Sequence, residues 1–212
     1  MKPVIHSNVI VGKKCTIEEG VEIGRPGKDG KYHKTVIGNN CCIRRGTIIY
    51  AGATLGTDVS TGHFALIRED NTIGNHVTIG SFTELGLRNS IGDNTLIHSR
   101  CFLEDATLGN NVFVGPGVVF TNDPHPSCPE FRSCFRGVVV GDWAMIGGGV
   151  TILPGVKIGK RALVGAGSVV TENVTSRSVV VGNPARKIKK IEDIVCTRPE
   201  KIHKPYAKDS AR

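Results

Sequence analysis

Apolar side chains recur at every sixth position over long stretches of this 212-residue chain. The longest unbroken series is Ile37, Ile43, Ile49, Leu55, Thr61, Ile67, Ile73, Ile79, Leu85, Ile91, Ile97 and Leu103. A small or β-branched residue follows most of these anchors four positions later, and glycine follows many of them directly. Neither the 3.6-residue period of a helix nor the two-residue period of an ordinary strand gives such a register. The pattern predicts short strands joined by tight corners, with one anchor per repeat pointing inward.

Two insertions and one shortened repeat divide the series. The register stops for residues 25–35, stops again for residues 121–139, and then returns as far as Val170. One residue is missing after Leu103. Three strands per coil give about eight coils, and strands about 4.8 Å apart make a prism about 40 Å long. We therefore predict an all-β, three-sided parallel β-helix over residues 1–182, with both insertions as loops.

The end of the chain follows a different pattern. Ile188, Ile191 and Ile194 fall on one face of a helix. A proline stands near the first turn of this segment and another stands beyond its end, as helices favour. The pattern predicts a short C-terminal α-helix within residues 183–196, packed on the prism, and a basic tail over residues 197–212.

The composition suits a narrow tube better than a conventional core. Aromatic residues make up only 5% of the chain, whereas glycine occurs 27 times. A tube lined by stacked aliphatic side chains has no room for large rings. Cys15, Cys41 and Cys101, three of the seven cysteines, fall four residues after an anchor. We expect these three to be buried, reduced thiols.

Charge and hydropathy limit the partners to be expected. The formal net charge is +8, and the basic residues are concentrated near the end of the chain. Aromatic stacking partners for single-stranded nucleic acid are few there, with Tyr206 as the one aromatic residue of the tail. No stretch reaches the roughly 18–20 continuous apolar residues of a membrane span. The first residues also lack the apolar run of a secretory signal, so we expect a cytoplasmic protein without membrane or nucleic-acid partners.

Units of the form aliphatic-Gly-x-x-small-x, closed by Gly182-Asn183-Pro184-Ala185, resemble the hexapeptide-repeat acyltransferases. The similarity is greatest to the branch that acetylates sugars and nucleotide-linked amino sugars in surface polysaccharide synthesis. It covers almost the whole chain and is strongest from Val112 to Lys187. The resemblance implies that the β-helix is left-handed and that the protein is a homotrimer. It also implies active sites in clefts between neighbouring prisms, along which acetyl-CoA lies as acyl donor.

The resemblance directs attention to the start of the second insertion, Asn122-Asp123-Pro124-His125-Pro126, where the family's catalytic histidine often lies. Acetyl transfer needs a base that takes a proton from the acceptor, and an imidazole that titrates near neutrality suits this step. The resemblance thus implies His125 as general base, Asn122 as a catalytic partner and Asp123 as a substrate contact. Alternatives are a water relay, an exposed loop histidine and ordinary Asn-Asp-Pro turn chemistry.

His98 and Glu104 precede this loop by one to two coils and lie outside the inward register. We expect them to contact the acceptor from an adjacent subunit. The alternative is that both are simply solvated outward residues.

Acetyl-CoA requires a floor of small residues for its pantetheine arm and cations for its phosphates. By family resemblance, the predicted cofactor-binding residues are Gly147, Gly165, Ala166, Gly167, Arg186 and Lys187. A backbone N–H within residues 147–149 would be the oxyanion donor. The alternative for the glycines is that they only satisfy the prism corners.

A metal site is the main competing interpretation of the second insertion. His125, Cys128 and Cys134 are zinc-ligand types, although only three are present and their spacing matches no standard knuckle. Cys128 and Cys134 could instead form a disulfide. No metal is expected.

Two other functions use the same prism. A γ-class carbonic anhydrase needs two histidines five residues apart on one coil, and this sequence has no such pair. A non-catalytic hexapeptide-repeat scaffold remains open as an alternative to the acyltransferase.

Overall fold

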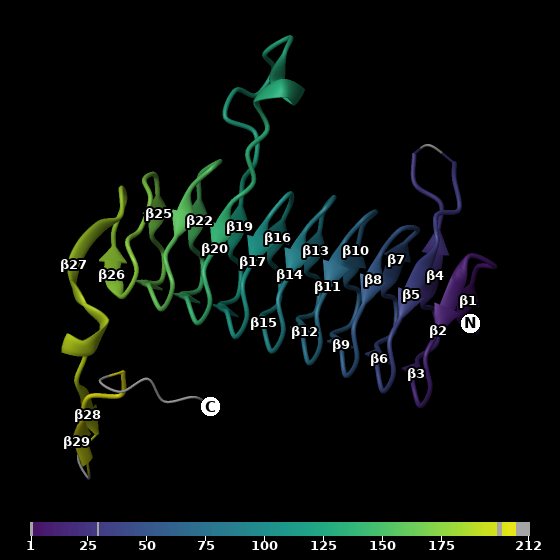
Figure 1. Ribbon diagram of the computed structural model, residues 1–212, viewed down its shortest axis with the longest axis horizontal. Helices are drawn as coiled ribbons and strands as arrows, with labels where there is room; N and C mark the ends of the chain where they lie inside the picture. The colour runs from purple at the N-terminus through teal and green to yellow at the C-terminus, as the bar shows by residue number, and fades with distance from the viewer. Residues whose placement is uncertain (1, 29, 199–200, 207–212) are drawn as a thin grey trace.

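The chain winds as a long three-sided prism (Figure 1). The computed structural model describes residues 2–28, 30–198 and 201–206. Parallel sheets A, B and C form the three faces, and each coil passes through them in that order. The coil is left-handed, as the resemblance implied. We call the turns between faces corner A–B, corner B–C and corner C–A.

The strands are short and stack in register from coil to coil. Sheet A contains β1 (Val4–Ile5), β4 (Glu22–Arg25), β7 (Ile48–Tyr50), β10 (Leu66–Ile67), β13 (Glu84–Leu85), β16 (Phe102–Leu103), β19 (Val119–Phe120), β22 (Thr151–Ile152) and β25 (Val169–Val170). Sheet B contains β2 (Val9–Val11), β5 (Thr35–Ile37), β8 (Thr54–Leu55), β11 (Thr72–Ile73), β14 (Ser90–Ile91), β17 (Thr107–Leu108), β20 (Val139–Val140) and β23 (Lys157–Ile158).

Sheet C carries the end of the chain. It contains β3 (Thr16–Ile17), β6 (Cys42–Ile43), β9 (Ser60–Thr61), β12 (Thr78–Ile79), β15 (Leu96–Ile97), β18 (Phe113–Val114), β21 (Met145–Ile146), β24 (Leu163–Val164), β26 (Ser178–Val181) and the antiparallel β27 (Arg186–Lys190). Outside the prism lie the 3₁₀ helices η1 (Phe131–Cys134) and η2 (Ile191–Asp193) and the antiparallel pair β28 (Cys196–Arg198) and β29 (Lys201–His203).

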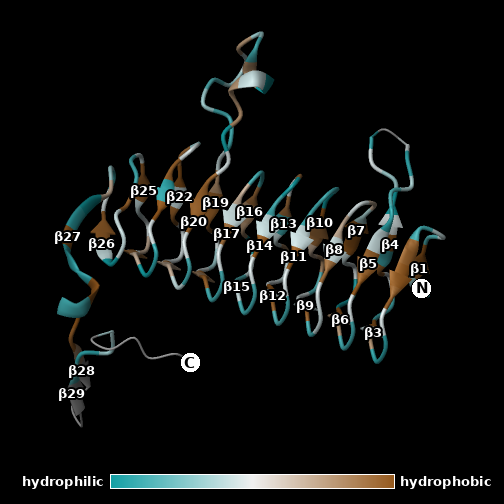
Figure 2. Cartoon of the chain, in the orientation of Figure 1, coloured by the Kyte–Doolittle hydropathy of each residue, from teal (hydrophilic) through white to brown (hydrophobic). Residues whose placement is uncertain are grey.

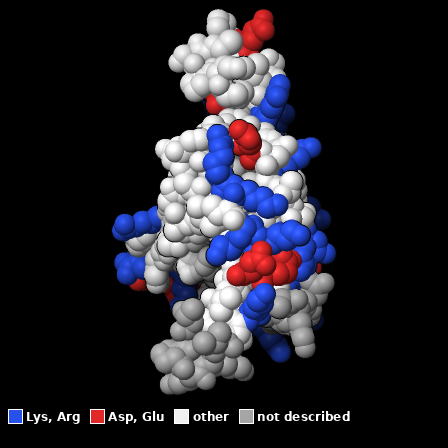
Figure 3. Space-filling model, turned by 90° about the vertical axis from the view of Figure 1, so that its left-hand side faces the viewer, with Lys and Arg blue, Asp and Glu red and all other residues white. Residues whose placement is uncertain are grey.

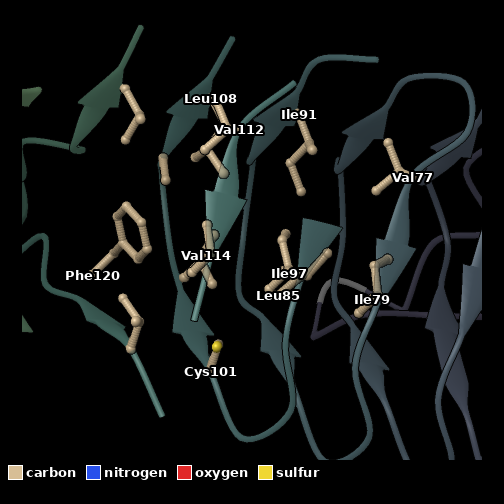
Figure 4. Packing of buried hydrophobic residues seen from close by; sticks show 14 of the residues in the cluster. Val77, Ile79, Leu85, Ile91, Ile97, Cys101, Leu108, Val112, Val114 and Phe120 are labelled. Carbon is tan, nitrogen blue, oxygen red and sulfur yellow. The ribbon is translucent and has the colours of Figure 1, made fainter. Parts of the chain in front are cut away.

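The anchors of the six-residue register form the core, as predicted. All members of the series from Ile37 to Leu103 are at most 3% exposed. Figure 4 shows side chains from Val77 to Phe120 pointing into the interior between coils. Burial of each such aliphatic side chain contributes about 1.5–3 kcal/mol to folding. Hydropathy follows the same division, with apolar residues along the strands and polar residues at the turns (Figure 2).

The predicted core thiols lie among these anchors. Cys41 and Cys101 are 1% and 2% exposed, and Cys15 is partly buried in the first coils. Burial raises the pKa of the Cys41 thiol to about 11 and also raises the pKa of Cys101. Both side chains are therefore protonated at neutral pH.

A ladder of Asn and Asp side chains keeps the coils in register at corner B–C. Each carboxamide or carboxylate oxygen accepts a hydrogen bond from a backbone N–H one coil earlier. The pairs are Lys13 N to Asn39 (2.7 Å), Thr57 N to Asn75 (2.9 Å), Asn75 N to Asp93 (2.6 Å), Asp93 N to Asn110 (2.8 Å) and Asn110 N to Asp142 (2.9 Å). The last pair spans the second insertion, so the prism continues in register on both sides of it.

The missing residue after Leu103 shortens one turn at corner A–B. The buried amide of Asn89 fills the gap, because it accepts a hydrogen bond from Ala106 N (2.9 Å) and donates to the Leu103 carbonyl (3.1 Å). A further bond joins it to Asn71 of the preceding coil (2.9 Å). The Asn89 amide therefore bonds to backbone groups on both sides of the deletion.

The predicted C-terminal helix is wrong. Residues 186–190 form strand β27, which pairs with β26 at the end of sheet C, and only the short η2 follows. Ile191 is buried, but Ile188 is 54% exposed, so the isoleucines do not share one buried face. The edge of β26 offers unpaired backbone groups, and pairing with them satisfies more hydrogen bonds than one isolated helical turn would.

The predicted basic tail at 197–212 lies partly outside the described residues, since 199–200 and 207–212 are not described. Within the part of the chain that the structure describes, no helix has the length and apolar character that crossing a membrane requires.

Candidate functional site

The second insertion leaves the prism between β19 and β20 at corner A–B and projects away from it (Figure 1). Its tip has a small aromatic cluster of its own. The rings of Phe131 and Phe135 meet edge to face at 5.5 Å, and the Arg132 guanidinium lies 5.6 Å from the Phe131 ring centroid. Such contacts give a projecting loop local order without a surrounding core.

Asn122 holds the base of this loop. Its side chain is 8% exposed, and its Nδ2 donates a hydrogen bond to Asp105 Oδ2 at 2.9 Å. The Asn122 carbonyl accepts a hydrogen bond from Arg136 N on the returning strand of the loop (2.9 Å). Asp105 is in turn bonded by Arg88 Nε at 2.8 Å. In this geometry Asn122 positions the loop, and a direct catalytic role for it stays a prediction.

His125 is exposed near the start of the same loop. The carboxylate of Asp123 accepts a hydrogen bond from the backbone N–H of His125 at 2.9 Å, which is typical of an Asx turn. Asp123 therefore fixes the backbone at His125. Its predicted contact with a substrate stays a prediction.

Glu104 lies one coil before the loop, also at corner A–B. It is partly buried, and burial followed by the neighbouring Asp105 carboxylate raises its pKa above the usual value for a glutamate. The guanidinium groups of Arg68 and Arg88 oppose this shift. The corner thus places a partly desolvated carboxyl group next to the base of the His125 loop.

A second feature is a cavity of about 850 Å³ on sheet C. Its wall along the sheet consists of the outward side chains of β15, β18, β21 and β24, namely Leu96, Phe113, Met145 and Leu163. Other lining residues are Asn94, Asn111, Trp143 and Arg161 at corner B–C and Ile191, Pro205 and Tyr206 from the C-terminal segment. The cavity is therefore a groove along the prism that the end of the chain partly covers.

Three of the four small residues predicted to hold a cofactor line this cavity: Gly147, Gly165 and Ala166. Gly167, the fourth, does not line it and occupies a turn with φ of 70°. A Cβ at Gly147 would lie 2.5 Å from Ala166 N, so the glycine is needed for close stacking of the coils. Gly147 therefore has a structural role in coil packing and also lines the surface that was predicted to hold the cofactor.

His98 flanks the cavity. It follows β15 directly, at the position that Gly147 and Gly165 hold in later coils, and its ring lies edge-on to Phe113 at 5.1 Å. The structure thus places His98 against Phe113 of the cavity wall, two coils before Gly147, and His98 itself does not line the cavity. His125 and Glu104 lie at corner A–B of the same chain, so one prism does not bring the two groups together.

Arg186 and Lys187 lie on β27, two strands beyond β24 along sheet C. Both are exposed, and Arg186 NH1 lies 3.7 Å from a carboxylate oxygen of Glu172. Figure 3, which views the C-terminal end of the prism, shows lysine and arginine side chains gathered over this end. The positively charged strand β27 therefore lies beyond the cavity along the same sheet.

The sequence pattern did not single out Trp143, Arg161 or Tyr206 as cavity residues. The outward side chains of the strands carry a sequence signal that could have located this cavity. On sheet B most of these are polar, as at Thr54 and Thr72, whereas on the later coils of sheet C they are large and apolar. A run of apolar outward residues on one face predicts a covered surface.

Cys128 and Cys134 are free thiols. Among the described residues, no group of three or more His, Cys, Asp or Glu side chains is arranged to hold a metal ion. The zinc interpretation of His125, Cys128 and Cys134 therefore has no ligand cluster to match it.

Comparisons with known proteins agree with the coil register. Residues 137–172 match the bacterial transferase hexapeptide family (six repeats), and residues 88–122 match the hexapeptide repeat of succinyl-transferase. A galactoside O-acetyltransferase from Lactococcus lactis is 38% identical over 95 residues, which are 42% of this chain and 45% of that protein. The chain thus spans less than half the length of this curated relative.

Two solved structures are also similar. A hexapeptide-repeat acetyltransferase from Vibrio cholerae, complexed with acetyl coenzyme A, is 31% identical with a TM-score of 0.50 over 55% of this chain and 69% of that one. A variant of AntD, an N-acyltransferase from Bacillus cereus in complex with dTDP and coenzyme A, is 27% identical with a TM-score of 0.51 over 74% of this chain and 84% of that one. Register, fold and these matches together show that the chain belongs to the hexapeptide-repeat acyltransferase family.

Proposed function

We propose that the protein transfers an acetyl group from acetyl-CoA to a sugar, with a nucleotide-linked amino sugar of surface polysaccharide synthesis as acceptor. The groove on sheet C carries this proposal. Its floor includes Gly147, Gly165 and Ala166, which let a pantetheine arm approach the backbone, and it leads toward the cationic strand β27. Arg186 and Lys187 suit the phosphates of the donor. The acetyl coenzyme A bound to the Vibrio relative, and the dTDP and coenzyme A bound to AntD, support the same donor and acceptor classes.

His125 is the base in this proposal. Its imidazole takes a proton from the acceptor hydroxyl as that oxygen attacks the thioester carbonyl, or from the ammonium group before the freed amine attacks. The C–S bond of the thioester then breaks, and the CoA thiolate leaves and takes up the proton that the imidazole returns. Asp123 and Asn122 hold the loop that carries the ring, through the hydrogen bonds to His125 N (2.9 Å) and Asp105 (2.9 Å). An exposed loop residue depends on such bonds for a fixed position.

The oxyanion donor is the backbone amide of Gly148. The amides of Gly147 and Gly149 donate to the carbonyls of Val164 and Pro116, both at 2.8 Å. The amide of Gly148 makes no bond of this kind to another described residue. It therefore remains available to the negative charge that develops on the thioester oxygen.

The active site combines two copies of the chain in a homotrimer. Sheet B presents mostly exposed polar residues, whereas sheet A presents Ile48, Leu66, Phe102 and Val119, and sheet C presents the apolar cavity wall. Burial of faces A and C against neighbouring copies leaves face B in water. A cyclic contact of face A with the next copy's face C brings the His125 loop of one subunit to the cavity of its neighbour.

Turnover with a panel of acceptors tests the function. Purified protein is incubated with acetyl-CoA and either nucleotide-linked amino sugars, free amino sugars or neutral sugars, and released CoA thiol is measured. We expect release with the nucleotide-linked amino sugars above the others. Absence of both CoA binding and thiol release would sink the acyltransferase proposal and favour the scaffold.

A further inference from the structure

The first insertion and the second insertion leave the prism at the same corner. Residues 26–34 connect β4 to β5, and the second insertion connects β19 to β20, so both loops rise from corner A–B (Figure 1). The side chains between them form a continuous row along the prism. This row is separate from the donor groove on sheet C.

The row contains an ordered cluster near the first insertion. Arg25, Tyr50 and Arg68 follow the anchors of successive coils, and Arg25 pairs in register with Tyr50. The two guanidinium groups lie 5.9 Å and 5.6 Å from the centroid of the Tyr50 ring. Cation–π contacts of this kind hold both arginines at one place on the corner.

Glu69 fixes the cluster to the first insertion. Its carboxylate accepts hydrogen bonds from Arg68 Nε (2.9 Å) and NH2 (3.2 Å). A Cβ at Gly27 would lie 2.2 Å from Glu69 Oε1, so the loop backbone rests directly on the carboxylate. A loop that carries Lys28, Lys31 and Lys34 is thereby held beside the two arginines.

Donor capacity remains in this cluster. A guanidinium group has five N–H donors, of which a bidentate carboxylate uses two. Arg68 uses Nε and one NH2 hydrogen toward Glu69, and Arg25 NH1 donates to Glu22 at 3.2 Å. The other donors of both planar groups suit phosphate oxygens, which guanidinium binds bidentately.

The row continues from the cluster to the proposed catalytic groups through Gly86. Gly86 stands between Arg68 and Glu104 in successive coils and is buried, and a Cβ there would lie 3.0 Å from Glu104 Cβ, so the Glu104 side chain lies against the glycine. Strands about 4.8 Å apart put Glu104 about 10 Å from Arg68 and about 14 Å from Tyr50 along the corner. A glycosyl group beside Glu104 with a diphosphate next to it spans a distance of this order.

We propose that Arg25, Tyr50 and Arg68 form the subsite for the diphosphate of a nucleoside-diphosphate sugar, which lies along corner A–B with its sugar toward Glu104 and the His125 loop. This inference rests on the proposed function, and it assigns the acceptor's anionic part to the first insertion and its reactive part to the second.

Calorimetric titration of the full chain with UDP and dTDP tests the subsite without turnover. The double variant Arg25→Gln/Arg68→Gln should weaken nucleoside-diphosphate binding by about tenfold or more, because charge-assisted hydrogen bonds are lost. The matched control Lys14→Gln/Lys157→Gln removes two positive charges at exposed positions on corner B–C and face B and should leave binding unchanged. Pyrophosphate should compete with UDP, and uridine should bind much more weakly than UDP.

CoA affinity of the double variant should equal that of the wild type, which confirms that the fold is intact. In turnover, KM for the nucleotide-linked acceptor should rise while kcat and the reaction with a free amino sugar stay unchanged. Equal UDP affinity in wild type and double variant, or equal binding of UDP and uridine, would overturn the subsite. Nucleotide binding that needs both arginines, without any acetyl transfer, would overturn the proposed function and leave the subsite standing.

Discussion

Corner A–B and corner C–A are built from the same repeat but differ in what they present to the outside. Corner A–B carries both insertions, the Arg25–Tyr50–Arg68 cluster and the partly buried Glu104. Corner C–A carries no insertion in the described residues and presents Phe64 and Phe82, which are 51% and 57% exposed. The inward anchors are alike at both corners. Function therefore depends on the outward residues, which the repeat leaves free to vary.

The two phenylalanines stand in a conformation that rarely suits them. Phe64 and Phe82 have φ angles of 55° and 58°, in the left-handed region where bulky residues are uncommon. Equivalent turns of other coils use glycine, as at Gly46 and Gly117. The rings stack at 5.4 Å with 13° between their planes and leave an apolar surface in water. Such a surface fits the trimer contact proposed above.

The largest expected effect is at corner A–B. Replacement His125→Ala should lower kcat by about 10²–10⁴-fold, the usual contribution of a general base. The matched control is His76→Ala at corner B–C, where the histidine is also exposed and lies 3.7 Å from Asp58. Steady-state rates with saturating acetyl-CoA measure both. Turnover that survives His125→Ala undiminished would remove the base assignment and favour a water relay.

The shared inward register predicts a large effect on stability at either corner. Leu85 is 0% exposed within the core, so Leu85→Ala should lower the free energy of unfolding by about 2–5 kcal/mol. Ser90→Ala, at an exposed outward position of β14, should change it by less than about 0.5 kcal/mol. Denaturant titration followed by circular dichroism gives both values. Similar losses for the two variants would contradict the inward and outward assignment.

Substitutions at corner C–A should weaken the assembly of the trimer. The double variant Phe64→Ser/Phe82→Ser should weaken the trimer by about tenfold or more, because exposed aromatic residues contribute strongly to interfaces. Val139→Ser removes a side chain that is 41% exposed on face B and should leave the assembly unchanged. Sedimentation velocity over a range of concentrations measures this. A double variant that remains as fully assembled as the wild type would place the contact elsewhere.

The smallest effect concerns pH. Burial and Asp105 raise the pKa of Glu104 in the folded protein, so the folded state binds this proton more tightly than the unfolded state does. Stability is then lost as pH rises through the unfolded and folded pKa values. Glu104→Gln should raise the Tm slightly near neutral pH and should leave it unchanged well below the usual glutamate pKa. A gain that is equal at both pH values would show that the carboxyl charge is not the cause.

The sequence predicted the inward part of the fold because the register repeats the same physical requirement in each coil. Anchors from Ile37 to Leu103, the thiols of Cys41 and Cys101 and the places of both insertions agree with the structure. The C-terminal helix failed because helical spacing of isoleucines carries no information about the free edge of β26, which residues 186–190 pair with. Here the pairing with a strand that is already part of the sheet outweighs the local helical pattern.

The site was predictable only in part for a related reason. Gly147, Gly165 and Ala166 were expected on one floor, and they line one cavity. Trp143 and Tyr206 were not expected, because their contact with that cavity depends on how corner B–C and the C-terminal segment fold over sheet C. The separation of His125 from the cavity follows from which corner each insertion leaves, and this becomes evident once strands are assigned to faces.

Mixed oligomers test most directly whether the active site combines two copies of the chain. One chain carries His125→Ala, and the other carries Ala166→Trp, which fills the donor groove at an exposed position. Each homogeneous variant should be inactive. Co-expressed in equal amounts and purified through two different tags, they should recover about a third of the wild-type sites, since each mixed trimer has one site that combines wild-type His125 from one copy with an open groove from its neighbour. Mixed oligomers no more active than either parent would contradict the shared site.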